Sequence, residues 1–444
     1  MRTGILLTFI IITCTGIVSS GQEAWTLQDC LDYAYENNLS LKRQGIQSDQ
    51  YKYALGESRA LLLPDLSLQS SGSLNFGRSV DPETNTITFN QNISNYYYLG
   101  TGVTLFNGFA RLNRIAAARY LYEMGMALEE RERDLLSMDI VNAYYNLLMA
   151  RGVAETASEQ LEVTNQQQRR TEVLVNTGKE SRTTLLEIKG QVSSDRLLKT
   201  QASNNVMLAL EELKMLLQLE SGQDFDIMKD DQLLNVNSHE PVSADSIFDV
   251  AREILPGIRV LELQTIAREK QLSAVRGESS PALGMYAGWR TGYYDAMAGG
   301  EDPAPFMEQL RNNTNQYVGV SLNIPIFDNW FHKRNIKRAK LDLDDSNLQL
   351  RQEYNTLYKE ISRASLELNA AREEYLAARD NLEYSNLVFE AVNKKFITGL
   401  ANATEYSEAK RQFFSAEVNL LRTQLQYNLK IITIKYYLSG SWDN

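Results

Sequence analysis

Residue types that usually build catalytic or metal sites are scarce in this sequence. It has only two cysteines and two histidines, and it contains no glycine-rich phosphate loop and no cluster with metal-ligand spacing. No convincing set of nucleophile, base and orienting residue is present, which disfavours a hydrolase. The net charge of −11 disfavours nucleic acid as a partner, because binding to phosphates needs cations. The sequence therefore predicts a protein that is not an enzyme and that has no cofactor and no metal.

Long apolar runs are missing too. Residues 1–21 have the pattern of a secretory signal peptide cleaved near Ser20 or Gly21, and their apolar run at 5–12 is too short for a membrane helix. No later run reaches the roughly 18 apolar residues that a membrane helix needs. Cys14 would suggest a lipoprotein, but Thr13 before it and its place inside the apolar region of the signal peptide argue against lipidation. If Cys14 is removed with the signal peptide, Cys30 alone remains and no internal disulfide can form.

The chain contains two copies of one pattern. Gly399 lies 221 positions after Gly178, and Phe327 lies 221 positions after Phe106. In and after the helical tip, seven residues recur unchanged at this offset: Thr177, Gly178, Thr183, Glu187, Lys189, Gln191 and Ser194. Such long-period similarity predicts that each copy is one structural unit.

Each copy is predicted to contain leading helices, a β-hairpin and a long helical hairpin. Residues 66–76 alternate between apolar and polar side chains, as a strand with one apolar face does, and such strands are long enough to cross a bilayer. The predicted segments are a signal peptide (1–21), leading helices (22–63 and 244–280), transmembrane β-hairpins (64–108 and 281–328), tunnel helical hairpins (109–219 and 329–438), an equatorial linker (220–243) and a C-terminal tail (439–444).

The predicted fold class is mostly α with a transmembrane β part. Four strands per chain cannot close a barrel, and open sheet edges are not tolerated in lipid, so we expect a trimer with a 12-stranded barrel. A long, coiled-coil-like α-helical tunnel would continue below the barrel. The alternative is a soluble β-sandwich with ordinary core aromatics.

Several segments resemble the TolC family of outer-membrane efflux ducts. They are the opening WTLQDCLDYAYENNLSL, Pro64 before a strand, the two hairpins, and the helical tips VNTGKES and ITGLANATE. The resemblance covers nearly all of the mature chain. It implies a homotrimer in outer-membrane lipid that extends into the periplasm. The tips would dock onto a periplasmic adaptor (membrane fusion) protein, and an inner-membrane efflux pump or ABC transporter would drive efflux or type I secretion. The alternative is a non-conducting periplasm-spanning scaffold or adhesin.

The resemblance also suggests a periplasmic gate just after the second tip. Similar proteins narrow the tunnel with acidic side chains, and the matching positions here are Glu405 and Glu408, with Glu187 as the first-copy equivalent of Glu408. Crowded carboxylates in a trimer would raise one another's pKa. The alternative is that these are solvated acids in the first turns of helices.

Two positions depart from the family pattern, and both concern how the gate stays closed. Phe396 stands where the family often has a tyrosine, and Ala401 where an arginine is usual. Other contacts must then lock the gate, and the candidates are Arg182, Lys189 and Lys410 pairing with the glutamates. The residues expected to dock the adaptor are Thr177, Gly178, Ser181, Thr398, Gly399 and Asn402. The alternative for each of them is a structural role in capping a helix.

Overall fold

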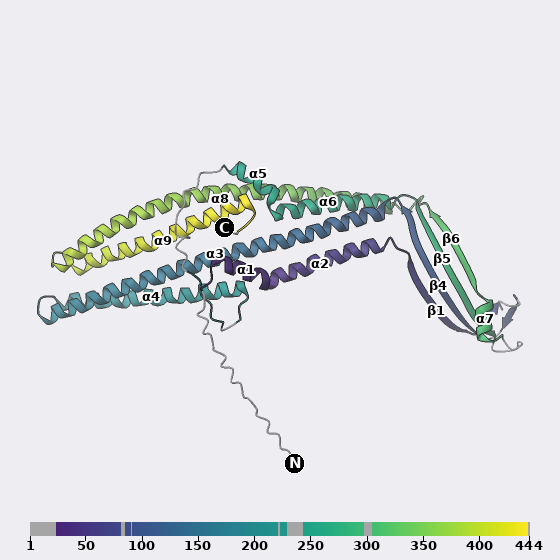
Figure 1. Cartoon of the computed structure of the whole chain (residues 1–444), viewed down its shortest axis with the longest axis horizontal. Coiled ribbons are helices and arrows are strands. Elements are labelled where there is room, and N and C mark those ends of the chain that lie inside the picture. The colour runs from purple at the N-terminus through teal and green to yellow at the C-terminus, as the bar shows by residue number, and fades with distance from the viewer. Residues whose placement is uncertain are drawn as a thin grey trace, which may run out of the picture.

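The structure is a computed structural model that describes residues 24–80, 85–89, 91–220, 223–228, 243–296 and 304–442. The predicted signal peptide with Cys14, most of the predicted linker and the last two residues lie outside the described residues. The described chain is long and narrow, with helices side by side along most of its length and a sheet at one end (Figure 1).

Two helices of 67 residues each run along the molecule, α3 (Ala110–Asn176) and α8 (Phe331–Ile397). At 1.5 Å per residue each is roughly 100 Å long. Gly152 lies within α3 without interrupting it, at the place where Leu421 packs against the helix. No helix within the described residues is long and apolar enough to cross a membrane.

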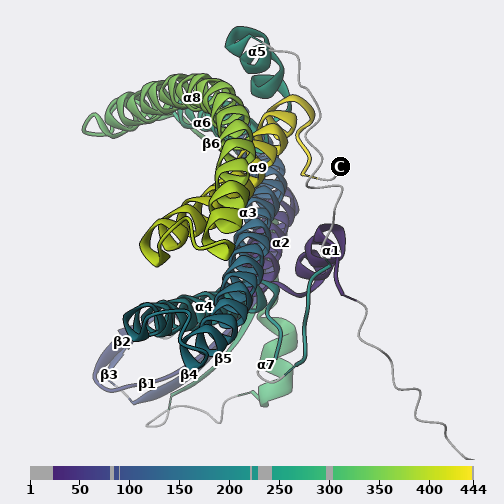
Figure 2. The same ribbon diagram turned by 90° about the vertical axis from the view of Figure 1, so that its left-hand side faces the viewer.

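Shorter helices flank the two long ones. Along α3 lie α2 (Leu39–Ala60) and α4 (Arg182–Leu217); along α8 lie α6 (Pro256–Gly277) and α9 (Ala403–Ser439). The two sets join through contacts of α3 with α6 and with α9. Viewed along the long axis, the helices form a curved layer that is concave on one side (Figure 2).

The molecule has its largest apolar core at mid-length. Helix α1 (Leu27–Asn37) packs there against α3 and α4, and its Cys30 and Leu31 are fully buried together with Tyr144. Ile227 and Trp442 join the same cluster, so the start of the predicted linker and the end of the chain meet beside α1. Helix α5 (Ala244–Ile254) packs nearby against α8 and α9 (Figure 1).

A single residue, Asn38, organises the break between α1 and α2. Its side-chain oxygen accepts hydrogen bonds from the backbone N–H groups of Ser40 and Leu41, which caps α2. Its amide nitrogen donates to the backbone oxygen of Leu216 at 3.1 Å. The helix break is therefore fastened to the end of α4.

The sheet is antiparallel, with strand order β1 (Asp65–Asn75), β4 (Asn92–Asn107), β5 (Ala282–Ala296), β6 (Asn315–Asn323). Strand β4 already begins at the polar residue Asn92. The polar residues at its start pair with β1, and the side chain of Asn75 adds a hydrogen bond by donating to Asn92 at 3.0 Å. The two predicted hairpins also contain further elements between their long strands: the strands β2 (Arg78–Val80) and β3 (Ile87–Phe89) in the first, and the helix α7 (Phe306–Asn312) in the second.

One face of the sheet is apolar and uncovered. Leu68, Leu99 and Trp289 lie next to one another across three strands. Leu68 is 69% exposed, and on β6 Val318 and Val320 are 70% and 62% exposed. Among the described strands, none pairs with the outer edge of β1 or of β6. In the described part of one copy, an apolar face and two hydrogen-bonding edges of the sheet are therefore left without partners.

The two copies of the repeat share their backbone geometry where the sheet passes into the long helices. Gly108 and Phe109 have φ of 63° and 61°, and the equivalent Asn329 and Trp330 have φ of 54° and 63°. Left-handed conformations are uncommon outside glycine, so their recurrence at equivalent positions of the two copies supports the internal repeat. The predicted fold class, mostly α with a four-stranded β part built from two repeats, is confirmed.

Candidate functional site

Both helical hairpins end in tight turns at the end of the molecule opposite to the sheet (Figure 1). Gly178 has φ of 70° and Gly399 has φ of 77°, a conformation that favours glycine. In each turn the N–H of the next residue donates to a carbonyl in the last turn of the preceding helix at 2.8 Å. The two tips are thus equivalent turns.

The polar residues predicted to dock an adaptor all shape these turns. The hydroxyls of Thr177 and Thr398 each donate to a carbonyl of the preceding helix at 3.0 Å. Ser181 accepts from a backbone N–H of α4 at 3.1 Å, and Asn402 accepts from the N–H of Glu405 at 2.8 Å. Capping is therefore their role within one copy, and adaptor docking stays a prediction.

The predicted gate acids lie on exposed helix faces near the tips. Glu405 and Glu408 are three residues apart on α9, and Glu187 is exposed on α4. Arg411 binds both carboxylate oxygens of Glu408, at 2.6 and 3.1 Å. The Arg411 guanidinium, with a further hydrogen bond from Gln412, holds the pKa of Glu408 below its usual range. Within one copy this direction is opposite to the one that crowding in a trimer would produce.

Phe396 joins the two arms of the second hairpin. Its ring stacks on Tyr406 of α9, with centroids 4.8 Å apart. Tyr406 is 4% exposed, and its burial together with the charge of Asp195 raises its pKa to about 12. Phe396 therefore acts as a packing residue between α8 and α9 in this structure.

Lys410 does not pair with the gate glutamates, so that prediction was wrong. Its side chain is fully buried, and its Nζ donates to Asp195 Oδ2 at 2.6 Å and to Thr164 Oγ1 at 2.5 Å. The reason is helical geometry: Lys410 follows Glu408 by two residues, so it lies on the opposite side of α9. That side packs against α3 and α4. Lys189 likewise forms its ion pair elsewhere, with Glu172 at 3.7 Å.

The polar cluster around Asp195 joins the two helical hairpins. Gln160 donates to Asp195 Oδ1 at 3.0 Å, Gln191 donates to the same oxygen at 2.7 Å, and Thr164 donates to Oδ2. Burial lowers the pKa of Lys410, and the adjacent carboxylate opposes that shift. The cluster connects α3 and α4 of the first copy to α9 of the second.

Sequence analysis missed Asp195, although one signal was present. The buried residues of α4 recur at steps of three, four and seven, and Asp195 falls on that stripe between Val192 and Ala202. A charged residue at an apolar position of a helix predicts a buried partner of opposite charge. The identity of the partner, Lys410, could not be read from this pattern.

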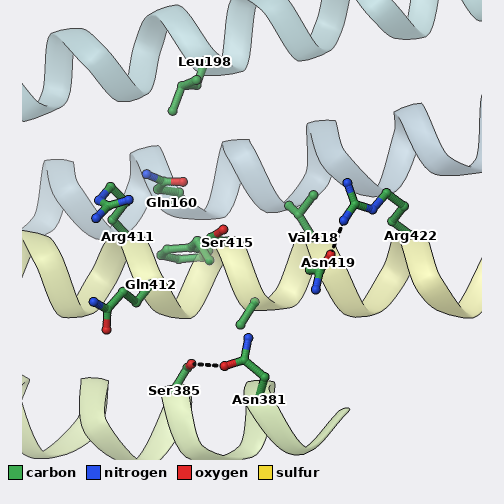
Figure 3. Close-up of a pocket in the computed structure, with 12 residues that line it drawn as sticks. Gln160, Leu198, Asn381, Ser385, Arg411, Gln412, Ser415, Val418, Asn419 and Arg422 are labelled. Atoms are coloured by element: carbon green, nitrogen blue, oxygen red, sulfur yellow. Dashed lines mark hydrogen bonds between the residues drawn. The ribbon is translucent and has the colours of Figure 1, made fainter. Parts of the chain in front are cut away.

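A groove of about 560 Å³ lies along α9 and is lined by both polar and apolar side chains, including Gln160 of α3 and Leu198 of α4 (Figure 3). On α9 its lining continues the helix face of Glu405 and Glu408 at steps of three and four, through Gln412, Ser415, Asn419 and Arg422. Asn381 and Ser385 of α8 lie across from them (Figure 3). In the part of the chain that the structure describes, no group of three or more His, Cys, Asp or Glu side chains is placed to hold a metal ion.

Comparison with known proteins gives one consistent result. The sequence matches the family described as "Outer membrane efflux protein" over residues 30–217 and 249–439. The outer membrane efflux protein BepC of Brucella suis is 23% identical over 420 residues, which cover 93% of this chain and 85% of that protein. The outer membrane protein TolC of Vibrio cholerae is 20% identical over 436 residues, which cover 97% of this chain and 94% of that protein. Among solved structures, the Campylobacter jejuni CmeC outer membrane channel is similar with a TM-score of 0.77 and 18% identity, over 99% of this chain and 94% of that one. These matches confirm the resemblance inferred from the tips and the opening segment. The chain belongs to the outer membrane efflux protein family.

Proposed function

We propose that three copies of this chain assemble into the outer-membrane exit duct of a tripartite efflux or type I secretion system. The family and its channel relatives support an exit duct for efflux that sits in the outer membrane and extends into the periplasm. They do not support the scaffold or adhesin alternative. The observation that supports assembly as a trimer is the incomplete sheet, which lies at one end of helices roughly 100 Å long.

Three copies would complete that sheet. The free edges of β1 and β6 would pair with those of neighbouring copies, and the four strands of each copy would give a closed barrel of 12 strands. The exposed apolar face with Leu68, Val318 and Val320 would then contact lipid. Closure satisfies every edge hydrogen bond, which the hydrocarbon region requires.

We assign the constriction of the duct to Glu405 and Glu408, with Glu187 beside them. Support comes from α9 itself, because the opposite side of this helix is buried through Lys410, Tyr406 and their partners. The exposed acidic face is then the one left to line a passage. A ring of carboxylates at low dielectric attracts cations.

We assign adaptor docking to the two tips, through the exposed faces of the turns at Gly178 and Gly399. Their capped, rigid geometry is suited to binding without reordering of the chain. The partners would be a periplasmic adaptor and an inner-membrane pump or ABC transporter, as the family membership suggests.

Single-channel current across a planar bilayer under a salt gradient tests the duct. The wild type should conduct with cation selectivity, and Glu405→Gln with Glu408→Gln should lose much of that selectivity. Glu162→Gln is the matched control, since Glu162 is an exposed acid on α3 that pairs with Arg169, and it should keep the selectivity. A protein that inserts and never conducts would contradict the proposed function.

A further inference from the structure

Basic residues are concentrated where the chain passes from β6 into α8. The start of α8, from Phe331 to Leu341, contains no acidic residue, although the whole chain has a net charge of −11. The lysines and arginines of this stretch are all exposed, and we call them the basic patch: Lys333, Arg334, Lys337, Arg338 and Lys340.

Three members of the basic patch have no acidic neighbour on their own helix. Lys333, Arg334 and Lys337 have only neutral or basic residues three and four positions away along α8. Lys333 and Lys337 are themselves four positions apart, and like charges at that spacing destabilise a helix. The helix dipole also opposes cations in the first turns, because its N-terminal end is positive. The patch therefore lowers the stability of α8 unless an anion lies against it.

The acidic residues that flank the basic patch do not neutralise it. Asp328 accepts from the backbone N–H of His332 at 2.7 Å, and its carboxylate lies 3.7 Å from the imidazole of the same residue. Asp342 and Asp344 follow the patch, four positions after its last two members. In the part of the chain that the structure describes, none of the five patch residues forms an ion pair. Their charge is left for a partner beyond these residues.

The first copy of the repeat has no such patch. At the same offset of 221, helix α3 has one basic residue among five: Leu112, Asn113, Ala116, Ala117 and Arg119. The arginines at the start of α3 are bound within the protein, since Arg111 donates to a backbone oxygen at 2.7 Å, Arg114 pairs with Glu278, and Arg119 pairs with Glu123 at 2.9 Å. The fold of the repeat therefore does not require the patch, and its charges belong to the second copy alone.

The basic patch lies directly beyond the apolar face of the sheet (Figure 1). Apolar exposure continues past the end of β6, because Ile326 is 95% exposed and Trp330 is 57% exposed. The ring of Trp330 packs edge-on against Phe327, and Lys333 Nζ lies 4.6 Å from the centroid of the Trp330 ring. Tryptophan and lysine are typical of the boundary between hydrocarbon and lipid headgroups. Within a few residues the surface changes from apolar to cationic, as it does where a chain leaves a bilayer.

We propose that the basic patch binds the phosphate groups of anionic phospholipids at the periplasmic surface of the outer membrane. The proposal rests on the proposed function, in which the apolar face of the sheet contacts lipid, and it names the class of lipid held at the end of that face. Ammonium and guanidinium groups bind phosphate through charge-assisted hydrogen bonds. Each cation close to an anionic membrane surface strengthens binding about fivefold. Bound phosphates would also relieve the repulsion between Lys333 and Lys337.

Lipid binding to the purified trimer tests the patch. The full-length protein in a mild non-ionic detergent is mixed with equal amounts of phosphatidylglycerol and phosphatidylcholine that have identical acyl chains, and bound lipids are counted by native mass spectrometry. The wild type should retain phosphatidylglycerol in preference. Lys333→Gln with Lys337→Gln should reduce that preference about 25-fold, from two charges at about fivefold each.

The matched control for this experiment is Lys394→Gln with Lys395→Gln. It removes two exposed lysines from the last turn of the same helix, far from the sheet, and it should keep the preference of the wild type. An equal loss in both variants, or a wild type without preference, would overturn the proposal.

Thermal dissociation of the trimer separates a lipid site from a contact between copies. Without lipid, Lys333→Gln with Lys337→Gln should leave the dissociation temperature unchanged or raise it, because like charges are removed. With phosphatidylglycerol present, the wild type should gain more stability than the variant. If the variant dissociates at a lower temperature without lipid, the patch pairs with a neighbouring copy and the proposal is wrong. A wild type that conducts but has no lipid preference would refute the lipid site alone, whereas one that never conducts would refute the proposed function.

Discussion

Replacing Lys410 with methionine would measure how firmly the two helical hairpins are joined. Methionine keeps most of the apolar length of lysine but removes the ammonium that lies 2.6 Å from Asp195 Oδ2. Asp195 is fully buried, so its carboxylate would stay in the interior without a cation. Breaking a buried pair from one side costs about 3–5 kcal/mol. Because Gln160 and Gln191 still donate to Asp195, we expect the low end of this range, about 3 kcal/mol.

A second ion pair on α9 provides the matched control. Lys430 Nζ also lies 2.6 Å from a carboxylate, that of Glu367, but both side chains are about one-third exposed and the pair lies within one hairpin. Arg363 also binds Glu367, so Lys430→Met should cost less than about 1 kcal/mol. Lys410→Met combined with Asp195→Leu removes both buried charges and should recover most of the loss.

Urea unfolding of the detergent-solubilised protein, followed by helical circular dichroism, gives the free energies of unfolding of the wild type and of the three variants. If Lys410→Met is no more destabilising than Lys430→Met, the buried cluster does not join the hairpins as the structure indicates. If the double variant is as unstable as the single one, the cost comes from lost packing and the uncompensated charge of Asp195 is not its cause.

Three other residues give separate tests of the structure. Gly277→Ala should lower the free energy of unfolding by about 1–3 kcal/mol, because the new Cβ would overlap the backbone oxygen of Gly108 where α6 meets the β4–α3 turn; a thermal unfolding curve that matches the wild type would contradict this. Burial raises the pKa of Asp134 from 3.8 to about 6, although Tyr436 donates a hydrogen bond to it. The Asp134 contribution to stability is therefore complete below about pH 4 and is lost as the pH rises through about 6, and Asp134→Asn should flatten stability over that window, measured by urea unfolding at several pH values. Burial raises the pKa of the Cys30 thiol to about 12, so a thiol reagent at neutral pH should modify it only after unfolding, and rapid labelling of the native protein would refute its burial.

Local signals in the sequence predicted the tips and the long helices well. Gly178 and Gly399 fix their turns through a positive φ, which depends on neighbouring residues alone. The 67-residue helices follow from an unbroken apolar period without proline. The repeat gave these predictions independent support, because the tip and the long helix each occur twice in the sequence, 221 positions apart.

Features that depend on distant residues could not be predicted in the same way. Asp195 and Lys410 are 215 residues apart, so their pairing is set by how α9 packs on α3 and α4. Helix α7 is seven residues long, too short to show a period, and Gln309 holds it through hydrogen bonds to the backbone of Tyr294 on β5. The hydrogen bonds of Arg411 to Glu408 differ, because a spacing of three on one helix is a local signal that could have been used.

The most direct test of the central claim is an electron cryo-microscopy structure of the purified full-length protein in a lipid disc. Our account predicts three copies around one axis, with the sheet edges of β1 and β6 paired between copies and Glu405 and Glu408 directed towards that axis. A particle with open sheet edges, or with these glutamates facing away from the axis, would contradict it.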